Sequence, residues 1–214
     1  MQKVHSGFRF TADASDRMRL ESAKILFQYL LMILASSVCG AAMNQMLSDA
    51  FINDQLSGVI LHFEGMFLGC DGLLSYLRCL LRYSMLDLIS LAGLFACSFS
   101  IFNYVISDLI LVFNGFRLGF CGVFLTHFLK GQGVYSLTYG TFFMFWIFRL
   151  SVVFLLLRFA FRGALWARKM KSYLPGGRKA LRGRVLISFV SSLLFTACSI
   201  LMLNTLYCVL IRLA

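Results

Sequence analysis

Long apolar stretches alternate with shorter polar segments along most of the chain. The apolar stretches cover residues 25–47, 84–103, 109–129, 135–157 and 185–211. Each one approaches or exceeds the roughly 20 apolar residues that a helix needs to cross a bilayer. The pattern predicts an all-α polytopic membrane protein, a bundle of about five transmembrane helices that forms one integral membrane domain over residues 25–214.

The polar N-terminal segment, residues 1–24, carries charges of both signs and is predicted to be a cytoplasmic tail. The first apolar stretch after it has two interpretations, a retained span or a cleaved signal peptide. Val38 occupies the position before Cys39 at which a lipoprotein signal has a small residue, and the stretch is longer than a signal core. We expect a retained span.

Residues 48–83 form the longest polar connection and mix acids with apolar residues. The apolar positions, among them Leu56, Val59, Ile60 and Phe63, recur three and four residues apart, which is typical of an amphipathic helix. Two interpretations stay open for this loop: an interfacial helix that docks a partner, or a linker lying on the headgroups.

The two central stretches are predicted to form a helical hairpin with a break at residues 103–108. The third stretch contains the sequence Asn-Gly-Phe-Arg-Leu-Gly, residues 114–119. A re-entrant loop at these residues is the alternative, and it would need surrounding protein to satisfy its backbone.

Glycine spacing in the third stretch predicts a close helix–helix contact. Gly115 and Gly119 lie one helical turn apart, so their missing side chains leave a flat strip for a neighbouring helix. The candidate helix-packing motif comprises Asn114, Gly115, Phe116, Gly119, Phe120 and Gly122.

Charged residues interrupt the predicted spans at a few positions: Asp87, Asp108, Arg117 and Arg149. A polar group at such depth costs at least a few kcal/mol without a partner, so each should face protein or water. Arg149 has two possible outcomes. It snorkels toward the near interface, or it pairs with Asp87 or Asp108.

Composition supports the membrane assignment, because 60% of the 214 residues are hydrophobic and only 14% are charged. Membrane lipids are therefore the expected surroundings. The formal net charge of +11 does not indicate nucleic-acid binding, since the basic residues cluster between the apolar stretches.

The basic residues also predict the orientation. Five of them precede the first span and nine lie in residues 158–184, whereas four lie on the opposite side. The positive-inside rule then places the N-terminus and the 158–184 loop in the cytoplasm, and the C-terminus and residues 48–83 outside.

Catalytic and metal-binding patterns are weak or missing in the sequence. The seven cysteines include no CxxC pair, and Cys70 and Cys79, which share the outside loop, are left open as either free thiols or a disulfide formed in an oxidising compartment. His62 and Glu64 face different directions on a helix and are a poor metal pair. With no recognisable nucleophile and no phosphate-binding loop, we expect no enzyme activity, no cofactor and no metal.

The central segment Leu111-Val-Phe-Asn-Gly-Phe-Arg-Leu-Gly-Phe-Cys-Gly-Val-Phe-Leu125 resembles the signature of the stage II sporulation protein M family. The matching positions are Phe113, Gly115, Phe116, Gly119 and Phe120. Chain length, the outside loop after the first span and the basic loop before the last span are also similar. Arg117 within the motif and the lack of a proline in the fourth span depart from the pattern.

The resemblance implies a non-catalytic scaffold for a peptidoglycan-degrading complex during engulfment in endospore formation. It implies a location in the bacterial cytoplasmic membrane, in the mother-cell membrane at the septum. It also implies two cell-wall hydrolases as partners, an amidase/endopeptidase and a lytic transglycosylase. The alternative from the residues themselves is a channel or transporter subunit, in which Asn114 and the charged residues of the spans line a polar path.

Overall fold

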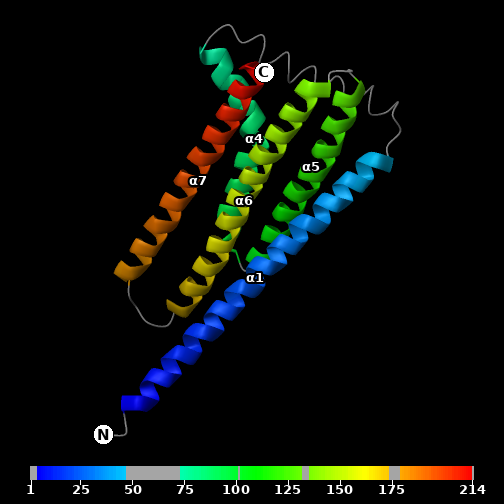
Figure 1. Ribbon diagram of the computed structural model, residues 1–214. Helices are drawn as coiled ribbons and strands as arrows, with labels where there is room; N and C mark the ends of the chain where they lie inside the picture. The colour runs from blue at the N-terminus through cyan, green and yellow to red at the C-terminus, as the bar shows by residue number, and fades with distance from the viewer. Residues whose placement is uncertain (1–3, 47–72, 101, 132–134, 174–178, 214) are drawn as a thin grey trace.

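The computed structural model describes residues 4–46, 73–100, 102–131, 135–173 and 179–213. These ranges form helices α1 (Val4–Met46), α4 (Leu73–Cys97), α5 (Asn103–Gly131), α6 (Tyr135–Tyr173) and α7 (Lys179–Leu213), with no strand among them (Figure 1). Each helix contains a segment long and apolar enough to cross a membrane. The predicted all-α polytopic class is confirmed.

Helices α4, α5, α6 and α7 pack together as a bundle, and α1 lies along the outer side of α5 (Figure 1). The N-terminal part of α1 runs past the end of the bundle at which α6 is joined to α7. The apolar part of α1, Glu21–Met46, agrees closely with the first predicted span.

Helix α4 begins and ends earlier in the chain than the predicted second span, residues 84–103. It ends at Cys97 rather than at residue 103. Residues 73–83, expected in the outside loop, are the first turns of α4. Arg78 and Arg82 do not end the helix, because arginine can extend its charged group toward the interface from within a span.

The break between the second and third helices falls at residues 98–102 rather than at the predicted 103–108. Backbone hydrogen bonds tighten the end of α4, with the Ser100 amide donating to the Cys97 carbonyl at 2.8 Å. The Phe102 amide donates to Ser100 Oγ at 3.2 Å, and α5 begins at the next residue. Helix α5 then continues without interruption through residues 114–119, so this segment is not a re-entrant loop.

The predicted fourth span, residues 135–157, lies within helix α6, which continues beyond it and carries Arg158 and Arg162. Helix α6 ends at Tyr173, two residues before Pro175, and proline disfavours the helical conformation at the residue that precedes it. The predicted fifth span, residues 185–211, lies within helix α7.

An aromatic cluster packs α4, α6 and α7 together toward the end of the bundle where α6 is joined to α7. Phe189 of α7 stacks on Trp166 and Phe159 of α6, with centroid distances of 5.0 and 5.2 Å. It also stacks on Phe95 of α4 at 5.4 Å. Such rings bury large apolar areas and fix the relative positions of the helices that carry them.

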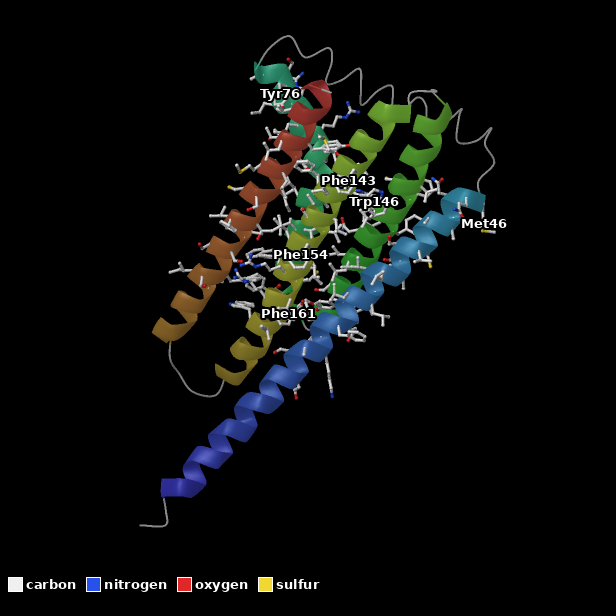
Figure 2. All side chains as sticks on the ribbon, viewed as in Figure 1. Met46, Tyr76, Phe143, Trp146, Phe154 and Phe161 are labelled. Atoms are coloured by element: carbon white, nitrogen blue, oxygen red, sulfur yellow. The ribbon has the colours of Figure 1, made fainter. Side chains whose placement is uncertain are left out.

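The outward faces of the helices are apolar. Phe27, Phe154 and Phe195 come from three different helices and are each more than 60% exposed. Figure 2 shows the Phe154 side chain among the sticks that project from the bundle. A contiguous apolar surface of this kind fits contact with lipid acyl chains.

Candidate functional site

Asp87 is the centre of a buried polar cluster. Its carboxylate, on α4, is only 1% exposed. Arg117 Nη2 of α5 donates to Asp87 Oδ1 at 2.7 Å, and Arg149 Nη1 of α6 donates to Oδ2 at 2.9 Å. One carboxylate thus pairs with guanidinium groups from two other helices, and such charged hydrogen bonds are the strong ones.

Helix α7 joins the same cluster through Asn204, which is 2% exposed. Its Nδ2 donates to Ser84 Oγ at 2.9 Å and to Asp87 Oδ2 at 3.3 Å. Side chains of α4, α5, α6 and α7 therefore meet at Asp87. We call Ser84, Asp87, Arg117, Arg149 and Asn204 the Asp87 cluster.

Aromatic rings cover one side of the cluster. The guanidinium carbon of Arg149 lies 4.5 Å from the centre of the Tyr83 ring, within the range of a cation–π contact. The Tyr207 ring stacks on Tyr83 with a centroid distance of 6.1 Å. These rings come from α4 and α7, so they reinforce the same helix contacts as the polar groups.

The charges of the Asp87 cluster do not balance. Two guanidinium groups are paired with one carboxylate, which leaves a formal charge of +1 on these three residues. Arg117 Nη1 is buried and has no hydrogen-bond partner among the residues that the structure describes. The cluster is therefore an electropositive point inside the bundle.

The Asp87 cluster lies toward the end of the bundle opposite the α6–α7 connection. Arg149 is closer to Tyr135, the start of α6, than to its end at Tyr173. Asn204 is closer to Leu213, the end of α7, than to its start at Lys179, and α7 runs antiparallel to α6.

Asn114 and Asp108 make separate contacts. Asn114, 4% exposed, donates through Nδ2 to Ser90 Oγ at 3.0 Å and to the Ile110 carbonyl at 2.8 Å. Asp108 Oδ2 accepts from Gln28 Nε2 of α1 at 3.4 Å. Of the four charged residues singled out in the sequence, three come together and Asp108 does not.

The glycines of the central motif lie at the contact between α5 and α1. A Cβ on Gly119 would collide with the Ser37 carbonyl, and one on Gly115 would meet Ser36 Oγ and lie 2.7 Å from the Ile33 carbonyl. On the other helix, a Cβ on Gly40 would collide with the Phe116 carbonyl. The backbones of α1 and α5 approach so closely here that larger side chains have no room.

The other motif residues contact different neighbours. A Cβ on Gly122 would collide with the ring of Trp146 on α6. Phe116 and Phe120 stack on each other along α5 at 6.0 Å, and the Phe120 carbonyl accepts a hydrogen bond from Asn44 Nδ2 of α1 at 3.3 Å. The motif thus contacts α1 on one side and α6 on another.

Several residues of these contacts were not singled out in the sequence: Ser36, Gly40 and Asn44 of α1, Tyr83 and Ser84 of α4, and Asn204 of α7. Ser36, Gly40 and Asn44 recur every fourth residue, a small-or-polar spacing that indicates a packing face. Asn204 is an amide within a strongly apolar stretch, which by itself predicts a polar partner in the bundle.

The candidate metal pair of His62 and Glu64 lies outside the described residues. The candidate disulfide between Cys70 and Cys79 cannot be placed either, because Cys70 lies outside them. Within the described part of the chain, no group of three His, Cys, Asp or Glu side chains is placed to hold a metal ion.

Comparisons of the chain with protein-family models, with curated proteins and with solved structures found no match. The Asp87 cluster and the α1–α5 glycine contact are therefore interpreted from their own geometry. Both of them join helices to one another.

Proposed function

We propose that the protein is a non-catalytic membrane scaffold for a peptidoglycan-degrading complex during engulfment in endospore formation. The engulfment role rests on the resemblance of residues 111–125 to the stage II sporulation protein M signature. In this proposal the chain lies in the mother-cell membrane at the septum. Its N-terminus is inside the cell and its C-terminus outside.

The observation that carries the scaffold role is the bridging position of Asp87. Its two carboxylate oxygens accept from arginines of two different helices, and a third helix adds Asn204. Charged groups that hold each other in this way fix the helices relative to one another. A fixed bundle keeps its outer loops at constant positions, which is what a platform for partner proteins requires.

A scaffold of this kind acts through effective concentration. Two enzymes that bind weakly to the same membrane protein encounter each other and the septal wall far more often than free molecules do. The proposed partners are an amidase/endopeptidase and a lytic transglycosylase, whose substrate lies outside the membrane. In the proposed topology, residues 48–72, the C-terminus and one end of each of α4, α5, α6 and α7 lie on that side.

Co-isolation from sporulating cells tests this function. An affinity-tagged copy replaces the gene, and membranes are cross-linked and solubilised during engulfment. Both hydrolases should be recovered with the wild-type chain, and also with Gly183→Ala, a change at an open position of α7. Failure to recover either enzyme with a normally abundant chain would contradict the scaffold role.

A second candidate, a subunit of a membrane channel or transporter, is favoured by the excess positive charge of the Asp87 cluster. Two arginines with one acid inside a bundle attract anions. Neutralising Arg117 and Arg149 at unchanged protein level distinguishes the candidates. Lost anion flux with intact hydrolase co-isolation supports transport, and lost co-isolation without a flux change supports the scaffold.

A further inference from the structure

Arg158 and Arg162 stand one helical turn apart on α6 and are exposed. They line a small pocket between α6 and α7, together with Ser192, Thr196 and the ring of Phe195. Both arginines closely follow the apolar stretch 135–157 on the same helix. The pocket is separate from the Asp87 cluster and lies toward the other end of the bundle.

The polar groups around this pocket are partly preorganised. Arg162 Nη1 donates to Ser192 Oγ at 2.9 Å, which directs the guanidinium toward α7. The Thr196 hydroxyl is held in place in a different way, because its Oγ1 donates to the Ser192 carbonyl at 2.8 Å. Among the described residues, neither Arg158 nor Arg162 forms an ion pair with an acid.

The surroundings make these charges significant. Arg158 and Arg162 closely follow the apolar stretch 135–157 on α6, and the neighbouring exposed ring of Phe195 on α7 is apolar. Arginine beside such a surface extends its guanidinium toward the interface and needs an anion or water there. Arg117 and Arg149 meet this requirement with Asp87, whereas Arg158 and Arg162 face outward, where lipid is the neighbour.

The exposed groups that border the pocket match a phosphate group bound at the surface. Two guanidinium forks and a hydroxyl are suited to phosphate oxygens, which they bind through short, charge-assisted hydrogen bonds. The exposed Phe195 ring beside them offers an apolar contact for an acyl chain. The stretch from Arg158 to Arg184 contains nine basic residues and no acid, which concentrates anionic lipids at this end of the bundle.

We propose that Arg158, Arg162 and Ser192 form a binding site for the phosphate of an anionic phospholipid, with an acyl chain against Phe195. The lipid would bridge α6 and α7 at the end of the bundle that the positive-inside rule assigns to the cytoplasm. The site does not depend on the proposed engulfment role, because it follows from unpaired charge at a lipid-facing surface.

Native mass spectrometry of the purified full-length chain tests the site. The probes are phosphatidylglycerol, phosphatidylcholine with the same acyl chains, and inorganic phosphate. The wild-type chain should retain phosphatidylglycerol in preference to phosphatidylcholine. The double variant Arg158→Gln with Arg162→Gln should bind phosphatidylglycerol about 30-fold more weakly, the effect of removing two basic residues near an anionic lipid.

Matched variants control for charge and folding. Arg78→Gln removes one charge from α4 at the opposite end of the bundle and should leave retention unchanged, whereas Arg158→Lys with Arg162→Lys keeps the charge and should retain the preference for phosphatidylglycerol. Equal binding of the two lipids by wild type, or unchanged retention by the double Gln variant, would overturn the site. Binding of inorganic phosphate that excludes phosphatidylglycerol would show a free-anion site and overturn the lipid assignment.

Discussion

At the scale of single residues, Asp87 is where polar side chains from three other helices converge. It is buried and accepts from Arg117, Arg149 and Asn204. Removing one partner of a buried ion pair leaves the other charge without compensation and costs more than the pair itself contributes. Neutralising Asp87 should therefore lower the stability of the protein much more than neutralising one of its arginines.

Asp87→Asn should destabilise the protein strongly, by about 3–5 kcal/mol, because two guanidinium groups are left without a carboxylate. The substitution keeps the shape of the side chain, so steric effects are small. Thermal unfolding of the purified chain in detergent, followed by circular dichroism, measures the loss. Asp108→Asn is the control, since Asp108 has only a 3.4 Å contact with Gln28 and should change stability little. Equal melting temperatures for Asp87→Asn and wild type would refute the bridging role.

Arg149→Gln should be milder than Asp87→Asn, with a loss of about 2 kcal/mol for a charged hydrogen bond. The reason is charge balance, because Asp87 then keeps one arginine, Arg117, at 2.7 Å. The double variant Asp87→Asn with Arg149→Gln should lose less unfolding free energy than the sum of the two single losses, as expected for residues in direct contact. Strict additivity in the same unfolding assay would show that the two residues do not interact.

At the scale of helices, the close contact between α1 and α5 depends on glycine. Gly119→Ala should cost about 1–3 kcal/mol, because its Cβ would collide with the Ser37 carbonyl, a backbone atom that cannot rotate away. Gly115→Leu should be worse. The matched control is Gly183→Ala, where a Cβ meets nothing within 4 Å and alanine favours helix.

Two measurements read out this helix contact. The first is the melting temperature, and the second is the yield of a disulfide engineered between α1 and α5 at neighbouring lipid-facing positions. We expect Gly119→Ala to lower both and Gly183→Ala to lower neither. If Gly119→Ala assembles and cross-links like wild type, the two helices do not need the close approach.

The five long apolar helices of the described residues were predictable from the sequence, whereas the partners of individual residues were not. Apolar length alone gave five spans, and the spacing of Gly115 and Gly119 indicated a packing face. Spacing gives only the direction of a face, so α1 could not be named as its partner. The pairing of Arg149 with Asp87 was one of two open outcomes, because relative helix positions decide it.

Helix ends were least predictable where arginine stands next to an apolar stretch. Arg82 precedes the predicted start of the second span, and Arg158 follows the predicted end of the fourth, yet both lie within helices, α4 and α6. The charge of arginine is separated from the backbone by a long apolar stem, so it does not mark the end of a helix.

At the scale of the whole molecule, the five predicted spans would place the two termini on opposite sides of the membrane. In a variant without the native cysteines, the substitution Ser57→Cys should introduce a thiol that reacts with a membrane-impermeant reagent on intact cells. The substitution Ser6→Cys should give a thiol that reacts only after the cells are opened. Protection at position 57 and labelling at position 6 on intact cells would reverse the orientation inferred from the basic residues.

The most direct test of the scaffold proposal is deletion of the gene in its sporulating host, with imaging of membrane-stained cells through engulfment. We expect arrest at a flat or bulging septum. The intact gene and Gly183→Ala should restore engulfment, and Asp87→Asn should not. Normal engulfment in the deletion strain, with no second copy of the gene, would contradict the engulfment role.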